Sequence, residues 1–302
     1  MNNSIGDSRR NGREIHRSAN VGRRALGNHI RAFAILVFIS FGFASSAGCE
    51  DRYGTIVVVK ISKDQAVVAA DTLELGTTRT EDTCKITALG EQIIFASTGK
   101  FGFDVSNLWT TISWDAHKEA ERAFARRGWP SWGRNDKEPI VRMAWHWVTD
   151  ASMTFQVAAE RKPSVVEPRE LDGAIVQGLF LGTGQSGDFV MARARLVVEA
   201  SGPSPIFKPE VKEQPTQNGL LVYGATAIFE EIYNRGKAER ESWEAKLLTE
   251  EPERRDLLTA IHLVDLAIRH DKSGTIGGKV DAVVLRRGGR IEWVQGGDRC
   301  KH

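Results

Sequence analysis

Short apolar runs separated by polar segments dominate this chain, and most of these runs predict β-strands. The runs at 56–59 and 66–70 flank a polar turn at 62–65, which predicts a β-hairpin. Similar runs predict strands at 93–96, 174–181, 189–198 and 220–224, and a hairpin over 280–294 with a Gly-Gly turn at 288–289. The glycine-rich segment 182–187 lacks the Gly-Lys-Ser/Thr ending of a phosphate loop, so we interpret it as a hairpin turn.

Helical spacing of apolar residues appears in the regions between these strands. It predicts a helical region running from Val105 through Ile112 to Ala116, a helix from about Pro139, a helix over 225–234 and an amphipathic helix through 257–268. A charged helix or linker is expected up to about 255, and the proline-containing segment 203–215 predicts a long loop. Strands and helices are thus segregated along the chain, which predicts an α+β fold of packed sheets with helices outside, in one domain over 53–302.

The first 48 residues have the features of a basic leader and signal peptide. Arg23, Arg24 and Arg31 precede an apolar run at 32–44, and small residues at 45–47 would suit cleavage. This run is shorter than the roughly 20 residues of a membrane-spanning helix. A terminal anchor or a buried helix is the alternative. We therefore expect an exported protein, periplasmic or secreted. Membrane attachment is expected only if Cys49, which follows a degenerate lipoprotein box, carries a lipid.

Composition excludes some classes of function. The chain has 302 residues, 41% of them apolar, and a formal net charge of +2, so it is globular and nucleic acid is not an expected partner. The seven histidines are scattered singly, without metal-ligand spacing, so no metal or cofactor is expected. Cys84 and Cys300 could form a disulfide in an oxidising compartment, which spacing alone does not decide.

Candidate chemistry lies near the start of the predicted domain. Thr55 follows Gly54 at the head of the first strand, Asp71 ends the second strand, and Lys85 precedes the third apolar run. Taken singly, these residues are an ordinary strand residue, a turn residue and a surface lysine. Together they supply the hydroxyl, acid and amine of an N-terminal threonine hydrolase, in which the freed α-amine of the threonine serves as its own base.

Two segments of the chain resemble the proteasome β-subunit family of N-terminal nucleophile (Ntn) hydrolases. The first runs from Gly54-Thr55-Ile56-Val57 through 69–72 to Cys84-Lys85-Ile86, and the second from 266–271 through Gly277-Gly278 to 280–284. The element order is similar over about 54–294. This resemblance implies a four-layer αββα sandwich, in which two packed antiparallel sheets are flanked by helices. It also implies assembly into a homo-oligomeric ring.

The resemblance also implies roles for individual residues. Thr55 would be the nucleophile, exposed by self-cleavage after Gly54. Lys85 would lower the pKa of the threonine hydroxyl and amine, and Asp71 would hold Lys85 in place. The backbone N–H at Gly99 would stabilise the oxyanion. Asp271 would match the family's supporting aspartate if two residues are inserted after it.

Two departures from the family pattern leave alternatives open. Ala225 stands where the family usually has a serine after a glycine, and Ile276 stands where a serine precedes the late Gly-Gly pair. We expect an exported threonine hydrolase that cleaves peptide or amide bonds. The first alternative is a catalytically inactive structural or assembly subunit of the same family. The second is an unrelated exported binding protein built on a β-sandwich.

Overall fold

The computed structural model describes residues 55–74, 82–106, 110–127, 138–167, 173–184, 186–200, 205–214, 216–224, 226–235 and 237–300. The chain divides between Gly48 and Cys49 into two units, and all of the described residues belong to the second. The predicted leader, Cys49, Gly54 and Ala225 lie outside the described residues.

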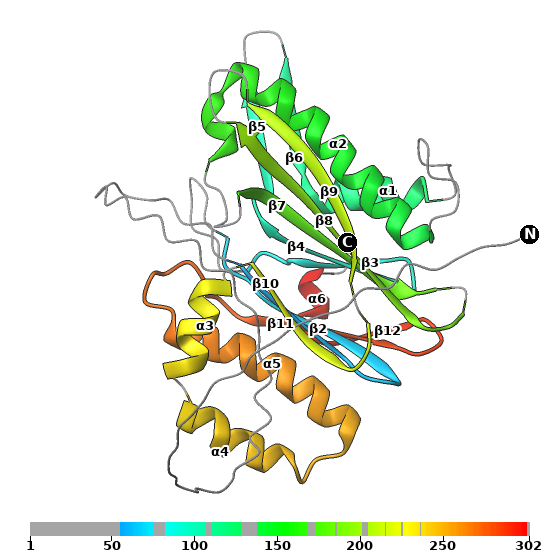
Figure 1. Cartoon of the computed structure of the whole chain (residues 1–302), viewed down its shortest axis with the longest axis vertical. Coiled ribbons are helices and arrows are strands. Elements are labelled where there is room, and N and C mark those ends of the chain that lie inside the picture. Colours follow the sequence, from blue (N-terminus) through cyan, green and yellow to red (C-terminus); the bar gives the residue numbers. More distant parts are fainter. Residues whose placement is uncertain are drawn as a thin grey trace, which may run out of the picture. The chain divides into compact units, whose positions relative to one another are not determined.

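Two five-stranded antiparallel sheets form the centre of this unit (Figure 1). The first sheet has the order β10-β1-β2-β11-β12, with bounds Gly219–Gly224, Ile56–Ile61, Gln65–Asp71, Val280–Arg286 and Arg290–Gln295. The second has the order β3-β4-β7-β8-β9, with bounds Ile86–Leu89, Ile93–Gly99, Ala174–Thr183, Phe189–Ala200 and Ile206–Gln214. A separate hairpin pairs β5 (Gly102–Ser106) with β6 (Thr111–Asp115).

Helices pack on the sheets, as Figure 1 shows for α2 beside the second sheet and α5 beside the first. The helices are α1 (Ala116–Ala125), α2 (Pro139–Arg161), the short 3-10 helix η1 (Pro163–Val166), α3 (Thr226–Arg235), α4 (Lys237–Leu247), α5 (Pro252–His270) and α6 (Gly297–Cys300). In the described segments, none of them is long and apolar enough to cross a bilayer.

Three buried apolar clusters hold the sheets and helices together. One lies between the two sheets and includes Val57 and Val59 of β1, whereas Ile56 and Val58 face the cluster formed with α5. The third cluster joins the second sheet to α1 and α2 around Trp147. Side chains alternate between the two faces of a strand, so a strand covered on both faces needs apolar residues at every position. This explains the unbroken apolar run that begins β1.

Most predicted elements are confirmed, including the β1–β2 and β11–β12 hairpins and the helices α2, α3 and α5. The helical region predicted from Val105 is wrong: the chain there forms β5 and β6, and α1 begins only at Ala116. The Asp115 side chain accepts hydrogen bonds from the backbone N–H groups of His117 and Lys118, which fixes the helix start. Val105, which belongs to the predicted helical spacing, is buried in the third cluster as a strand residue, and Ile112 packs against the same cluster.

The long loop predicted over 203–215 is also wrong, because β9 occupies most of it. Pro209 has no N–H to donate, but β9 is an edge strand paired only with β8. An edge strand tolerates proline, because one side of its backbone makes no ladder bonds. The short helix α6, which carries Cys300, was not predicted.

Replacing Phe155 should test the packing of the third cluster, which joins α1 and α2 to the second sheet. Phe155 of α2 is fully buried and its ring packs edge-on against Phe103 and Trp114. We expect Phe155→Ala to lower the free energy of unfolding by about 3–5 kcal/mol, measured by denaturant titration. Met153 on the same helix is 58% exposed, so Met153→Ala should change the free energy of unfolding by less than about 0.5 kcal/mol. Equal effects of the two substitutions would contradict this packing.

Candidate active site

The β1–β2 hairpin brings Thr55 and Asp71 to the same end of the first sheet. The strands are antiparallel, with Val57 opposite Ala70, so the residue before β1 lies near the residue that ends β2. Lys85 comes from the other sheet, directly before β3. The three predicted residues therefore meet where the ends of the two sheets face each other.

Lys85 contacts both of the other residues. Its Nζ donates hydrogen bonds to Thr55 Oγ1 at 2.9 Å and to Asp71 Oδ1 at 3.0 Å. The Lys85 and Asp71 side chains are completely buried, and Thr55 is 3% exposed. The Phe101 ring covers the ammonium group, with its centroid 5.4 Å from Nζ. The interpretation of Lys85 as a surface residue is therefore wrong, and the structure brings the three predicted residues together.

Asp71 accepts more than one backbone hydrogen bond. Its Oδ1 also accepts from the N–H of Ile56 at 3.0 Å, and its Oδ2 accepts from the N–H of Gly277 at 3.2 Å. Burial raises the pKa of Asp71, while Lys85 and these two N–H groups act in the opposite direction. Because all three donors point at the carboxylate oxygens, the ionised form makes the full set of bonds, and we assign Asp71 as the carboxylate.

Burial has the opposite effect on the lysine. It lowers the pKa of Lys85 from the ordinary value of 10.5, and the charges of Asp71, Glu74 and Asp281 partly offset this. An amine with a lowered pKa gives up its proton more readily, and this one lies within hydrogen-bonding distance of a hydroxyl. The neutral Lys85 amine can therefore accept a proton from Thr55, and the charged form can return one to it.

Gly99 ends β4 in a backbone conformation that only glycine adopts easily. Its φ is +80°, and a Cβ at this position would lie 2.4 Å from the Ile175 carbonyl oxygen. The neighbouring Thr98 lies beside Gly224, whose own added Cβ would meet the Thr55 carbonyl oxygen at 1.9 Å and the Thr98 methyl at 3.2 Å. The end of β4 is thus packed against the start of β1. Thr98 lies at this contact, and Gly99 is the next residue along the chain.

Asp271, the residue after α5, organises the loop that follows this helix. Its carboxylate accepts hydrogen bonds from the N–H groups of Ser273 (2.8 Å), Thr275 (2.7 Å) and Ile276 (2.6 Å), and from the Ser273 and Thr275 hydroxyls. Desolvation raises the pKa of Asp271, but these bonds outweigh it and leave the pKa below 3.8. This stabilisation is complete at neutral pH and is lost only as the pH falls through that lower value.

The loop after α5 reaches the site through Gly277, a contact that sequence reasoning missed. The Gly277 N–H donates to Asp71, and its carbonyl accepts from the N–H groups of Thr72 (3.2 Å) and Leu73 (3.0 Å). The Lys279 N–H donates to Thr72 Oγ1 at 2.8 Å. The Gly-Gly pair was visible in the sequence as a turn, but nothing local linked it to Asp71. Asp271 therefore supports the site indirectly, through the loop that presents Gly277.

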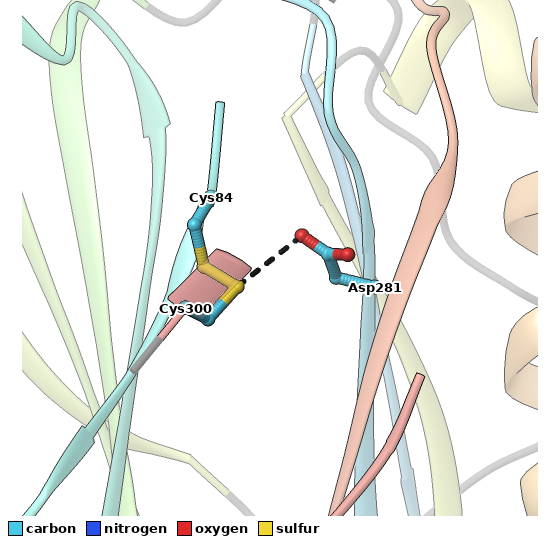
Figure 2. A group of neighbouring side chains, drawn as sticks. All are labelled: Cys84, Asp281 and Cys300. Carbon is cyan, nitrogen blue, oxygen red and sulfur yellow. Dashed lines mark hydrogen bonds between the residues drawn. A yellow bond between two sulfur atoms is a disulfide. The ribbon is translucent and has the colours of Figure 1, made fainter. Parts of the chain in front are cut away.

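The possible disulfide is present, between Cys84 and Cys300, with the Asp281 carboxylate beside it (Figure 2). In the described part of the chain, these three side chains are the group that could hold a metal ion, with ligand atoms within 4.8 Å of one another. The S–S bond occupies both sulfur atoms, so the oxidised chain offers only the carboxylate.

Comparison with known proteins adds no identification. No model of a known protein family matches this chain, and no curated protein matches it either.

The close approach at Gly224 can be tested with a matched pair of substitutions. Gly224 and Gly187 have similar φ angles, +87° and +80°, but an added Cβ has no neighbour within 4 Å at Gly187. Both alanine variants share the strain of a positive φ. We expect Gly224→Ala to lower the unfolding free energy by about 1–3 kcal/mol more than Gly187→Ala, measured by denaturant titration. Equal losses would contradict the packing of β10 on Thr55.

Removing the Asp271 carboxylate should loosen the loop that presents Gly277. We expect Asp271→Ala to lower the unfolding free energy by about 1–3 kcal/mol, because several N–H groups lose their acceptor. Hydrogen exchange at the Gly277 amide should become faster. Asp265 on the same helix makes an exposed ion pair with Arg269, so Asp265→Ala should cost less than about 1 kcal/mol. Unchanged exchange at Gly277 in Asp271→Ala would argue against this supporting role.

Proposed function

We propose that this chain is an exported threonine hydrolase of the Ntn type, which cleaves peptide or amide bonds after exposing Thr55 as its amino terminus. The observation that carries this proposal is the buried Lys85 Nζ, within 3.0 Å of both Thr55 Oγ1 and Asp71 Oδ1. A hydroxyl held against a lysine that a carboxylate orients is the arrangement of an activated nucleophile. Charged groups are seldom buried so completely without a function or a partner.

The layer arrangement supports the same proposal. Apolar clusters join α1 and α2 to the second sheet, the second sheet to the first, and the first sheet to α5. This order is compatible with the four-layer αββα sandwich of Ntn hydrolases, and we propose that the domain has that fold. The disulfide supports export, because such bonds persist mainly in oxidising compartments.

The proposed self-cleavage begins with the peptide bond still intact. The reactive form has Lys85 as the neutral amine, which its lowered pKa makes accessible. Thr55 Oγ1 attacks the carbonyl carbon of Gly54, and its proton passes to this amine. The C–N bond breaks, the threonine nitrogen takes up a proton, and an ester joins Gly54 to the hydroxyl oxygen. The Thr55 amine is free at this point. Water then hydrolyses the ester, which releases the Gly54 carboxylate and the Thr55 hydroxyl.

In turnover the freed amine takes part as the base. An α-amine has a pKa of about 7.7–8.0, so near neutral pH a fraction of it can accept the hydroxyl proton. Thr55 Oγ1 then attacks the substrate carbonyl, the amine component leaves with a proton, and water hydrolyses the resulting ester. A backbone N–H at Gly99 would stabilise the oxyanion, a contribution of about 3–4 kcal/mol. Assembly into a homo-oligomeric ring remains part of the proposal by family resemblance alone.

One observation favours the alternative of an inactive structural subunit. Ile276 is buried in the apolar cluster with α5, at the position where the family places a hydroxyl. The nearby hydroxyls, those of Ser273 and Thr275, are hydrogen-bonded to Asp271 and to each other.

Intact-mass measurement of the full chain, expressed with its own leader, decides between these functions. We expect a mature protein that begins at Thr55 and reacts with a threonine-directed electrophile such as an epoxyketone, because only a free amine and hydroxyl together close that adduct. Thr55→Ala should keep the Gly54–Thr55 bond and lose labelling, whereas Thr249→Ala, at an exposed site after α4, should behave as the parent chain. Folded protein that stays uncleaved and unlabelled would refute the proposal and leave the inactive subunit.

A further inference from the structure

The disulfide joins the C-terminal end of the described chain to the residue next to Lys85. Cys84 directly precedes Lys85, and Cys300 ends α6, 216 positions later in the sequence. Figure 2 shows the Cys300 sulfur between Cys84 and the carboxylate of Asp281, which β11 carries. The S–S bond therefore ties the backbone at Lys85 to an element that packs on the first sheet.

The other contacts of this segment are non-covalent. Residues 82–85 form no regular structure, and β3, which begins at Ile86, has four residues and lies at the edge of the second sheet. The Ser97 N–H donates to the Lys85 carbonyl at 3.3 Å, and the Thr83 N–H donates to the Thr72 carbonyl at 3.0 Å. A short edge strand restrains its first residue weakly. The disulfide adds a covalent attachment one residue from Lys85.

Asp281 connects the disulfide to the same charged centre. It is fully buried on β11 opposite Ala70, next to the pairing of Val280 with Asp71. Its Oδ2 lies 3.4 Å from Cys300 Sγ, and its charge acts on Lys85 together with those of Asp71 and Glu74. A disulfide sulfur has no proton to donate, whereas a Cys300 thiol could donate one to this carboxylate. Reduction would therefore change both the tether and the surroundings of Asp281.

We propose that the Cys84–Cys300 disulfide is the positioning element that holds Lys85 against Thr55, so that oxidation of these two thiols completes the site. The part of this inference that concerns reactivity rests on the proposed function. Formation of the bond removes two electrons and two protons from the thiols. A disulfide oxidant such as oxidised glutathione takes them up, and its own S–S bond becomes two thiols.

The first test measures how accessible the Lys85 amine is to a reagent, and it does not depend on enzymatic activity. Reductive methylation with formaldehyde and a borohydride, followed by peptide mass spectrometry, compares the parent chain with the Cys84→Ser/Cys300→Ser double variant. We expect Lys85, fully buried in the parent, to be methylated at least tenfold faster in the double variant. Lys100 is the internal control for general unfolding, because its Nζ is bonded to the Val165 and Glu167 carbonyls and should stay protected. Equal protection of Lys85 in both chains would overturn the proposal.

The second test measures how the disulfide affects the reactivity of Thr55. Labelling by the electrophile is followed against pH in the parent, in the double variant, and in Thr249→Ala, which keeps the disulfide and lies at an exposed site. We expect the double variant to label at least tenfold more slowly at neutral pH. Its half-maximal pH should move upward, because a displaced Lys85 no longer lowers the pKa of the Thr55 amine. Thr249→Ala should match the parent. A rate within twofold of the parent and an unmoved profile would overturn the proposal.

The two tests separate this inference from the proposed function. If Lys85 loses protection in the double variant while no chain labels at Thr55, the positioning role stands and the threonine hydrolase falls. A chelator is included in every sample, so that the serine variants and the parent are compared without bound metal.

Discussion

The burial of one lysine–aspartate pair is the constraint on which this end of the molecule depends. Removing two opposite charges from water costs several kcal/mol per ion, and the pair is tolerated only if its geometry and its remaining hydrogen bonds are complete. Asp71 meets this condition by accepting from Lys85, Ile56 and Gly277. The register of β1 on β2 and the path of the loop after α5 are therefore requirements of the charged pair.

A buried ion pair contributes little net stability, which bears on why this one is present. Apolar residues of similar size would often stabilise a protein as well or better. The pair instead holds an amine with a lowered pKa 2.9 Å from a hydroxyl. Perturbed pKa values of this kind gather at reactive sites, and the three side chains together have the composition of an activated nucleophile. This reasoning supports chemistry at Thr55 more strongly than a structural role.

The supporting contacts come from distant parts of the sequence. Asp271 shapes the loop that presents Gly277, and Gly224 allows β10 to approach the Thr55 backbone. The disulfide brings Cys300 to the residue before Lys85. Each of these contacts restrains Thr55 or one of its two partners, Asp71 and Lys85, from a different direction. The site is therefore a product of both sheets and of the C-terminal segment, and not of the first hairpin alone.

Most of the strands, the main helices and the nearness of Thr55 to Asp71 could be predicted from the sequence, because these follow from side-chain periodicity and from a short antiparallel hairpin. The sequence did not decide the burial of Lys85, the link from Asp271 through Gly277, or the β5–β6 hairpin in place of a helix. Those features depend on which faces of distant elements meet. Periodicity records only that a residue has a buried side, and the tertiary structure decides what that side is buried against.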